Sequence, residues 1–379
     1  MSKKIFFSAG EPSGDLHASK LAAEIKKIEP SISLKGIGGA NMASAGVSLF
    51  YRTDELSIIG LVDVFKHLAK IREMLFSFLA KAEEEKVDLV ILVDYPGFNL
   101  RLACELKKRG IKVVYYISPQ VWAWGRDRIK KIKQCVDKII VLCEFEADIY
   151  KKAGVPVEFV GHPLMDAAEP SSGKGAVKER LRLDSAKKTV ALLPGSRIRE
   201  ITALLPTMAA ASQKLYEKYG EIQFIVVRPP NISGEIYEEC LKGLKAPYHM
   251  VENAGSELYE CLSVSDIAIV ASGTATLECA IMNVPMVITY KVSLFNAIVM
   301  RLFMRVSTIG LVNILSGRKI VPELVQFDFT AGRVFREASK ILFDPQESSR
   351  IKQELSKVKR SLGEKGASRR TAISVINSL

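Results

Sequence analysis

The sequence predicts an α/β fold with two Rossmann-like domains, and three observations support this prediction. Short apolar runs alternate with segments of helical spacing in both halves of the chain, which is the pattern of a parallel sheet with helical crossovers. Each half also begins with a strand, a glycine-containing loop and a helix, at Ile5–Leu21 and again from Thr189 onward. Finally, 379 residues are enough for two domains that each bury a core.

The first domain is predicted over residues 1–165. Gly36–Gly39 is interpreted as a strand-to-helix turn, and a helix is expected over Glu144–Lys152. Apolar runs predict strands that helices cover on both faces, and these runs are Ile5–Ala9, Leu89–Val93, Val113–Ile117 and Ile139–Leu142.

The second domain is predicted over residues 166–349. The approach to it, Pro163–Asp184, contains a Pro-Ser-Ser-Gly segment and is interpreted as a linker. Beyond Phe329 the chain is expected to be helical. The predicted strands of this domain are Thr189–Leu193, Gln223–Val227, Ile267–Val270 and Met286–Thr289.

Composition places the chain among globular proteins, with 48% hydrophobic and 25% charged residues. No apolar run reaches the ~20 residues of a membrane span, and no signal peptide is recognised after Met1. The six cysteines contain no C-x-x-C pair. They are predicted to be reduced, buried side chains in a cytoplasmic protein.

The net charge of +12 is compatible with nucleic acid, an anionic membrane surface or an anionic substrate. Nucleic-acid binding favours a basic cluster with interleaved aromatic residues. Lys and Arg are instead spread along this chain. A membrane surface and an anionic substrate are therefore ranked above nucleic acid.

The first glycine loop is a candidate substrate-binding loop. Gly10 and Gly14 frame a turn before a helix, Ser13 is expected to cap that helix, and Asp15 lies in its first turn. Free N–H groups there suit a phosphate or a sugar hydroxyl. The G-x-x-x-G spacing matches neither a dinucleotide fingerprint nor a P-loop, and the loop by itself also fits an ordinary βα turn.

Five segments, in order, resemble the signatures of lipid-A-disaccharide synthases, which are glycosyltransferases of the two-Rossmann-domain (GT-B) type. The resemblance extends from residue 5 to the region of Asn313. It implies a cleft between the domains and a C-terminal helix, about residues 350–379, that packs back on the first domain. The segments are GEPSGDLHA in the first loop, Asp94–Asn99 (DYPGFN), Ser118–Trp124 (SPQVWAW), Leu192–Arg197 (LLPGSR) and Ala271–Glu278 (ASGTATLE).

Asp94 is the predicted catalytic base, with Glu11 as the alternate. Asp94 ends an apolar run, so it should lie at the carboxyl end of a parallel strand, where ligands bind. A carboxylate in that position can take the proton of an acceptor hydroxyl; the alternative is an Asp that caps the turn. Asn99 is expected to cap the next helix. Trp122 and Trp124 either stack on a sugar ring or pin their loop as core residues.

Two loops of the second domain are predicted to hold the donor. An arginine at a helix N-terminus suits a diphosphate, and a glutamate one turn into a helix can accept the two hydroxyls of a ribose. The alternatives are a surface arginine at a turn and a solvent-facing glutamate. The predicted donor residues are Gly195, Ser196, Arg197, Ser272, Gly273, Thr274 and Glu278, with Asn313 and Arg318 added by the resemblance.

No metal is predicted. The chain has no Asp-x-Asp pair, and its four histidines lack zinc-site spacing. Arg197 and two helix N-termini are expected to neutralise the leaving diphosphate instead.

The resemblance implies an inverting hexosyltransferase of lipid A biosynthesis without a cofactor. It would join UDP-2,3-diacylglucosamine to 2,3-diacylglucosamine 1-phosphate, giving the β-1,6-linked disaccharide and UDP. The protein is expected on the cytoplasmic face of the inner membrane as a peripheral protein, and a homodimer is left open. The alternatives are an enzyme like UDP-N-acetylglucosamine 2-epimerase and a non-enzymatic basic protein that binds RNA or membranes.

Two stretches are candidates for membrane contact. Ile58–Ala80 has apolar residues at helical spacing together with basic residues, so it either packs on the sheet or lies on lipid. Leu294–Met304 is apolar but is interrupted by Arg301, which argues against a buried span.

Overall fold

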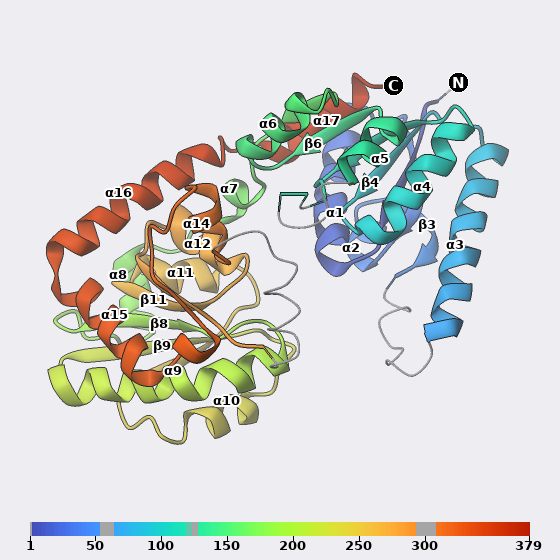
Figure 1. Cartoon of the computed structure of the whole chain (residues 1–379). Helices are drawn as coiled ribbons and strands as arrows, with labels where there is room; N and C mark the ends of the chain where they lie inside the picture. Colours follow the sequence, from blue (N-terminus) through green and yellow to red (C-terminus); the bar gives the residue numbers. More distant parts are fainter. Residues whose placement is uncertain (1, 54–63, 120, 123–127, 293–307) are drawn as a thin grey trace. The chain divides into compact units, whose positions relative to one another are not determined.

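The computed structural model describes residues 2–53, 64–119, 121–122, 128–292 and 308–379. The chain divides into two units (Figure 1): unit 1 is Met1–Pro163 with Leu362–Leu379, and unit 2 is Leu164–Ser361. The second unit begins two residues earlier than predicted. The segment that returns to unit 1 begins at Leu362, later than the expected residue 350.

Seven strands of the described chain form the sheet of unit 1, in the order β3-β2-β1-β4-β5-β6-β7. Every neighbouring pair is parallel. In chain order they are β1 (Lys4–Ala9), β2 (Ser33–Gly38), β3 (Ser48–Arg52), β4 (Leu89–Val93), β5 (Lys112–Tyr116), β6 (Lys138–Val141) and β7 (Val157–Phe159). The helices are α1 (Pro12–Ile28), α2 (Ala40–Ser44), α3 (Val64–Glu84), α4 (Pro96–Lys108), α5 (Arg128–Cys135), α6 (Glu144–Lys152) and α17 (Ala367–Ile376).

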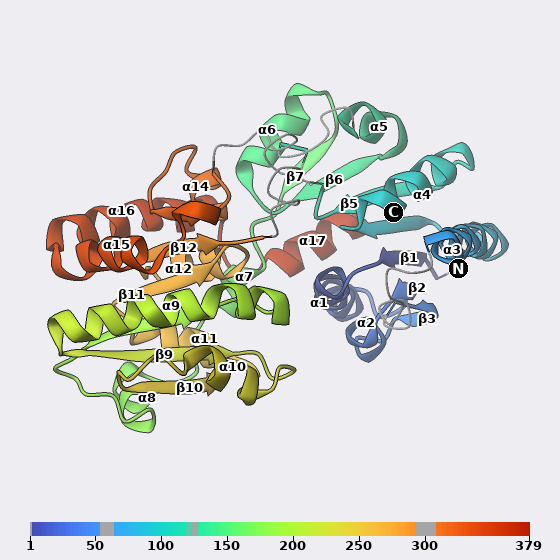
Figure 2. The same cartoon turned by 60° about the horizontal axis from the view of Figure 1, so that its bottom comes forward.

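The central strands of unit 1, β1, β4 and β5, are mostly apolar because helices cover both faces of the sheet. Along β1, Ile5 and Phe7 enter the core shared with α1 and α17, whereas Phe6 enters the core shared with α3, α4 and α5. Figure 2 shows α1 and α17 on one side of this sheet and α4 and α5 on the other. Alternate side chains point to opposite faces of a strand, so both sets must be hydrophobic.

The sheet of unit 2 is also parallel throughout its described strands, in the order β10-β9-β8-β11-β12-β13. In chain order they are β8 (Lys188–Leu193), β9 (Ile222–Arg228), β10 (Tyr248–Glu252), β11 (Ile267–Ala271), β12 (Met286–Tyr290) and β13 (Glu323–Val325). The helical elements are α7 (Leu164–Ala167), α8 (Lys174–Arg180), α9 (Ile198–Tyr219), α10 (Gly234–Leu241), α11 (Glu257–Ser263), α12 (Ala275–Ile281), α14 (Leu311–Leu315), η1 (Gln326–Asp328), α15 (Ala331–Phe343) and α16 (Pro345–Ser361).

The predicted turn at Gly36–Gly39 is wrong for its first three residues, which belong to β2. The reason is the close approach of β1: a Cβ on Gly36 would lie 2.2 Å from the carbonyl oxygen of Phe7. Glycine therefore serves strand packing at this position. Only Gly39 lies in the turn, as the residue before α2.

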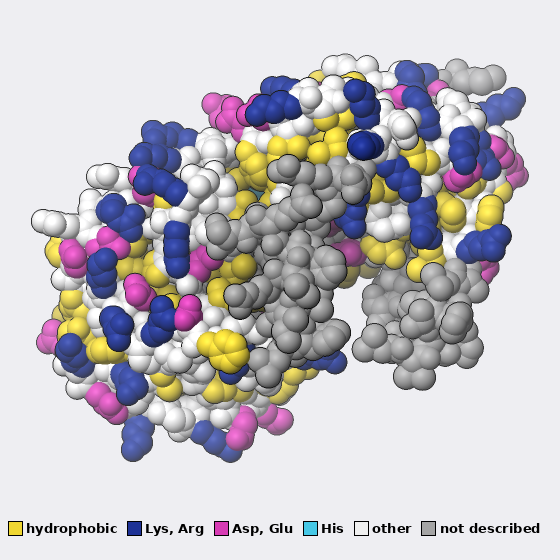
Figure 3. Space-filling model, viewed as in Figure 1, with side chains coloured by type: hydrophobic (Ala, Val, Ile, Leu, Met, Phe, Trp, Pro, Cys, Tyr) yellow, Lys and Arg dark blue, Asp and Glu magenta, His cyan; other side chains and the backbone are white. Residues whose placement is uncertain are grey.

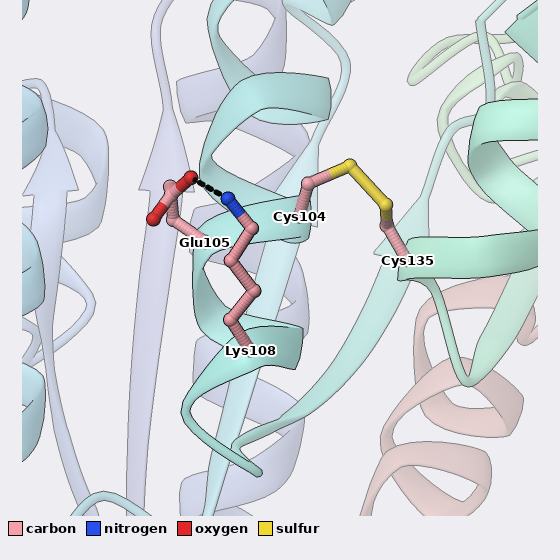
Figure 4. The surroundings of a disulfide bond; sticks show 4 residues. All are labelled: Cys104, Glu105, Lys108 and Cys135. Atoms are coloured by element: carbon pink, nitrogen blue, oxygen red, sulfur yellow. Dashed lines mark hydrogen bonds and ion pairs between the residues drawn. A yellow bond between two sulfur atoms is a disulfide. The ribbon is translucent and has the colours of Figure 1, made fainter.

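The prediction that all cysteines are reduced is also wrong. Cys104 on α4 and Cys135 at the end of α5 form a disulfide, with Cα atoms 4.6 Å apart (Figure 4). The two helices pack side by side, which brings together residues that are 31 positions apart in the sequence. Cys143, Cys240, Cys261 and Cys279 are free.

The described side chains of α3 favour the packing interpretation of Ile58–Ala80. Met74 and Phe78 lie one turn apart and are buried in the core of unit 1, while Phe76 is 54% exposed. Residues 54–63, the side chains of 64–69 and the second stretch, Leu294–Met304, lie outside the described residues. Among the helices that are described, none is both long and apolar enough to cross a membrane.

On the face shown in Figure 3, Lys and Arg side chains are scattered over both units, with acidic side chains between them. This distribution agrees with the low rank given to nucleic-acid binding.

Candidate functional site

The loop after β4 has a strained backbone. Asp94 and Tyr95 have φ angles of 48° and 47°, a left-handed conformation that costs L-residues roughly 1–2 kcal/mol each. Three hydrogen bonds hold Asp94 there: its N–H donates to the carbonyl of Tyr116 at 3.2 Å, and its carbonyl accepts from Tyr115 Oη and Asn99 Nδ2, each at 2.7 Å. Strain of this kind is concentrated at functional sites.

The structure brings together Asp94 and Glu11, the two predicted catalytic carboxylates. Tyr95 packs on Gly10, where a Cβ would lie 2.2 Å from the tyrosine ring, so the first glycine loop lies directly against the loop after β4. Burial raises the pKa of Asp94, and the negative charge of Glu11 raises it further. A carboxylate with a raised pKa is a better proton acceptor near neutral pH.

Asp15 was predicted as part of the candidate substrate-binding loop, and its carboxylate forms hydrogen bonds inside the protein. It is buried and accepts four hydrogen bonds, between 2.7 and 3.1 Å, from Gly39, Asn41 and Met42. Asp15 thereby fastens α1 to the start of α2, and Gly14 beside it is buried as well.

The predicted helix caps are wrong. Helix α1 begins at Pro12 after Glu11, because proline suits the first helical position, and Ser13 is already inside the helix. Tyr95 precedes α4, so Asn99 is not its cap. Asn99 is fully buried; it accepts from Ser8 Oγ at 2.7 Å and donates to the carbonyls of Ser8, Val93 and Asp94. It braces the loop that carries the proposed base.

Trp122 holds its loop against α6, which is the structural role that was given above as the alternative to stacking on a sugar ring. Its indole N–H donates to Glu146 Oε1 at 3.3 Å, and its ring meets Phe145 edge-on, with centroids 5.7 Å apart. Burial raises the pKa of Glu146 to about 7. The sequence reasoning missed Glu146, although its place in the first turn after β6 was a usable signal. Trp124 lies outside the described residues.

A pocket of about 330 Å³ lies at the carboxyl ends of β8 and β11 in unit 2. Its walls include all seven residues that loop position and helix spacing predicted for the donor, namely Gly195, Ser196, Arg197, Ser272, Gly273, Thr274 and Glu278. Further lining residues were not predicted, among them Glu200, Val227, Pro229, Asn253 and Leu258. Two glycine loops that are 78 positions apart thus form one pocket because β8 and β11 are neighbours.

At one end of this pocket, the positive charge of Arg197 is exposed. The side chain of Arg197, the residue before α9, is 80% exposed. One guanidinium nitrogen lies 2.8 Å from Glu200 Oε1. A guanidinium at a helix N-terminus, beside the glycine loop, offers the donors that a phosphate oxygen accepts.

At another wall, Glu278 is held in place by a tyrosine. Tyr259 Oη donates to Glu278 Oε1 at 2.8 Å, and burial raises the pKa of the carboxyl group. Glu278 is therefore a half-buried acceptor of fixed orientation, which suits hydroxyl groups of a ligand.

Asn313 and Arg318, the weaker donor candidates, do not line this pocket. Asn313 is buried; its amide donates to the carbonyl of Val321 and to Glu323, and its oxygen accepts from Ile320 and Val321. Arg318 pairs with Glu354. Their contacts in this structure organise the segment around α14, and a donor contact remains a prediction.

Within the described ranges, no group of three or more His, Cys, Asp or Glu side chains is arranged to hold a metal ion. The metal-free mechanism remains a prediction.

Comparison with solved structures identifies the fold. A UDP-GlcNAc 2-epimerase from Neisseria meningitidis, solved with UDP-GlcNAc, superposes with a TM-score of 0.64 and 12% identity, covering 99% of each chain. The calicheamicin glycosyltransferase superposes with a TM-score of 0.62 and 11% identity, over 100% of this chain and 98% of the other. At these identities the likeness shows the two-domain α/β fold alone.

Comparison with protein sequences identifies the family. Lipid-A-disaccharide synthase of Geobacter sulfurreducens is 40% identical over 378 residues, which are 100% of this chain and 98% of the relative. The Myxococcus xanthus protein of the same name is 39% identical over 376 residues, 99% of this chain and 97% of the relative. The family described as lipid-A-disaccharide synthetase matches residues 5–376. The chain therefore belongs to the lipid-A-disaccharide synthase family.

Proposed function

We propose that this protein transfers the diacylglucosamine of UDP-2,3-diacylglucosamine to 2,3-diacylglucosamine 1-phosphate, releasing UDP and inverting the anomeric carbon. The observation that carries the proposal is full-length membership of the family, together with a pocket whose walls suit a uridine diphosphate. The product is the β-1,6-linked disaccharide 1-phosphate of lipid A.

In the proposed mechanism, Asp94 removes the proton of the acceptor 6-hydroxyl while its oxygen attacks the donor anomeric carbon. The hydrogen bonds from Tyr115 and Asn99 hold the Asp94 backbone, so the carboxylate is oriented before substrate binds. Arg197 and the amides of the glycine loops stabilise the charge that develops on UDP. Glu278, held by Tyr259, accepts hydrogen bonds from the ribose.

Mass spectrometry of the products formed from the two diacylated sugars tests this function. The expected products are the tetraacylated disaccharide 1-phosphate and UDP, in equal amounts with and without EDTA. Loss of activity in EDTA with rescue by Mg²⁺ would show that the metal-free mechanism is wrong.

An epimerase-like activity is the second candidate, and it has the fold similarity alone in its favour. Incubation with UDP-N-acetylglucosamine alone separates the two functions. The proposed transferase leaves this nucleotide unchanged, whereas an epimerase produces a new epimer.

We also propose that unit 1 contacts an anionic membrane through the exposed face of α3. Both substrates carry acyl chains, so the enzyme must meet lipid. Phe76 is exposed beside a groove of about 340 Å³ between α3 and α4, and the groove is flanked by Arg72 and Arg101. Basic side chains near an anionic leaflet contribute roughly 1 kcal/mol each.

Two phenylalanines of α3 provide a matched test. Phe76→Ser should weaken binding to phosphatidylglycerol vesicles and leave the melting temperature unchanged. Phe78 is fully buried, so Phe78→Ser should destabilise unit 1 by about 3–5 kcal/mol. Unchanged vesicle binding by Phe76→Ser would show that this face does not contact lipid.

A further inference from the structure

Glu200 places a negative charge where the donor diphosphate is proposed to bind. Its Oε2 accepts the backbone N–H of Ser196 at 3.2 Å, and its Oε1 lies 2.8 Å from a guanidinium nitrogen of Arg197. The carboxylate reaches so far over the loop that a Cβ on Gly195 would lie 2.5 Å from Oε2. All four of these residues line the pocket of unit 2.

The groups that Glu200 engages are the ones a phosphate needs. A loop amide and a guanidinium at the N-terminus of a long helix form an anion-binding arrangement, and the carboxylate of Glu200 engages the Ser196 amide and one guanidinium nitrogen of Arg197. A diphosphate oxygen can use these two donors only if Glu200 withdraws or shares them, whereas the other guanidinium N–H groups stay available.

Replacing the Glu200 carboxylate by a diphosphate oxygen costs little free energy because the Arg197–Glu200 ion pair is exposed. The side chain of Arg197 is 80% exposed and that of Glu200 is 33% exposed. Pairs in such surroundings contribute little stability, since water solvates each partner when they separate. The charges of this pair also act on Tyr290: after the larger effect of burial, Glu200 raises the pKa of Tyr290, and Arg197 lowers it.

We infer that Glu200 is a built-in competing anion, which occupies the diphosphate donors of the empty pocket, is displaced by the donor nucleotide and weakens the hold on UDP after transfer. Glu200 is then a positioning residue that limits product affinity. The inference rests on the proposed function, because it assumes that this pocket binds UDP.

A purely structural role for Glu200 predicts the opposite change in affinity. Glu200 is the third residue of α9, a position from which glutamate often hydrogen-bonds back to the helix start. If Glu200 only braced the loop, its removal would loosen Ser196 and Arg197, and UDP would bind more weakly or unchanged.

Calorimetric titration with UDP, inorganic pyrophosphate and uridine separates these roles. Glu200→Gln keeps an acceptor for Ser196 but removes the charge. It should bind UDP and pyrophosphate about 2- to 5-fold more tightly, the effect of one exposed charge, and uridine as before. Stopped-flow measurement should show slower UDP dissociation. Glu200→Ala should shift the affinity in the same direction.

The control is Glu239→Gln, which breaks an exposed pair with Lys242 of the same sequence spacing outside the pocket and should leave all three affinities unchanged. Unchanged or weaker UDP binding by folded Glu200→Gln, with normal disaccharide formation by the wild type, would overturn the inference and leave the proposed function intact. If the wild type binds no UDP and forms no disaccharide, both are wrong.

Discussion

At the carboxyl ends of their strands, the two units use different backbones. Unit 1 holds non-glycine residues in the left-handed region, at Asp94, Tyr95 and Ile117, with φ angles of 48°, 47° and 60°. Unit 2 has glycines in its corresponding loops, Gly195 and Gly273, with φ angles of 113° and 158°. The contrast holds for the loops that carry the predicted site residues: strained non-glycine residues follow β4 and β5 of unit 1, and glycine loops follow β8 and β11 of unit 2.

This difference separates two tasks. Strain around Asp94 persists because Tyr115 and Asn99 hydrogen-bond its backbone, and the result is a carboxylate in a fixed place, as proton transfer requires. Gly273 carries no side chain between the backbone and the pocket, so a phosphate can approach the loop amides. We therefore propose that unit 1 orients a reacting group and that unit 2 surrounds an anion.

The largest expected effect tests the side-chain task of unit 1. Asp94→Asn should lower turnover by roughly 10²–10⁴-fold, the usual contribution of a general base, while UDP affinity stays normal because unit 2 is untouched. Initial rates and calorimetry check both statements. Glu11→Gln is the matched variant: a larger loss there than in Asp94→Asn would transfer the role of base to Glu11.

The disulfide of unit 1 should be the next largest effect, this time on stability. For the 31-residue separation of Cys104 and Cys135, a cross-link stabilises by about 3–4 kcal/mol in the chain-entropy model. Cys104→Ser should lower the melting temperature of unit 1. Cys240→Ser, at a free cysteine of unit 2, is the control. Without reductant, thiol titration of the unfolded wild type should detect four cysteines; six would show that the disulfide is absent.

We expect the anion binding proposed for unit 2 to depend most on Arg197. Arg197→Ala should weaken UDP binding by about 10- to 100-fold, as expected for hydrogen bonds to a charged group, and should weaken pyrophosphate binding to a similar degree. Calorimetry with both ligands measures this effect. Retention of full pyrophosphate affinity would mean that Arg197 does not contact the diphosphate.

Glu278 should affect only the binding of the nucleoside part of UDP. Glu278→Gln is expected to weaken the binding of UDP by about 3- to 10-fold, because it loses one hydrogen-bond acceptor for the ribose. The binding of pyrophosphate should not change. Equal losses for both ligands would indicate that the pair with Tyr259 supports the pocket as a whole.

The last prediction concerns a pH dependence of stability in unit 1, which leaves substrate binding untouched. Burial raises the pKa of folded Glu146 from 4.5 to about 7, so between these values the folded state binds more protons than the unfolded state. Its stability must then fall as pH rises through this window. Glu146→Gln, whose amide oxygen still accepts a hydrogen bond from Trp122, should lose this dependence. The melting temperature of the variant should therefore rise relative to that of the wild type as the pH increases from 5 to 7.5. A melting-temperature difference between variant and wild type that stays the same over this pH range would contradict the raised pKa of Glu146.

Local sequence was sufficient to predict a strand or helix where the signal lies within that one segment. Leu89–Val93 and Glu144–Lys152 were predicted with the bounds that the structure shows, because an apolar run or a helical period is a local signal. The strands β2, β3, β7, β10 and β13 were not predicted. The residues of β3, β7 and β10 are mostly half-buried, so a mixture of polar and apolar side chains replaces the continuous apolar run. Two glycines and a lysine interrupt the apolar run of β2, and β13 has only three residues.

The seven residues predicted for the donor line one pocket, and they were predictable because each lies in a glycine loop after a strand or one turn into the helix that follows. The assembly of this pocket required the sheet order, which places β8 beside β11. The roles of Asp15, Asn99 and Asn313 were not predictable. Sequence marks them as polar residues in promising loops, but only packing decides whether a polar group faces a ligand or the protein. Buried donors and acceptors must find partners, and those partners lie up to 91 positions away. The disulfide depended in the same way on two helices meeting in space.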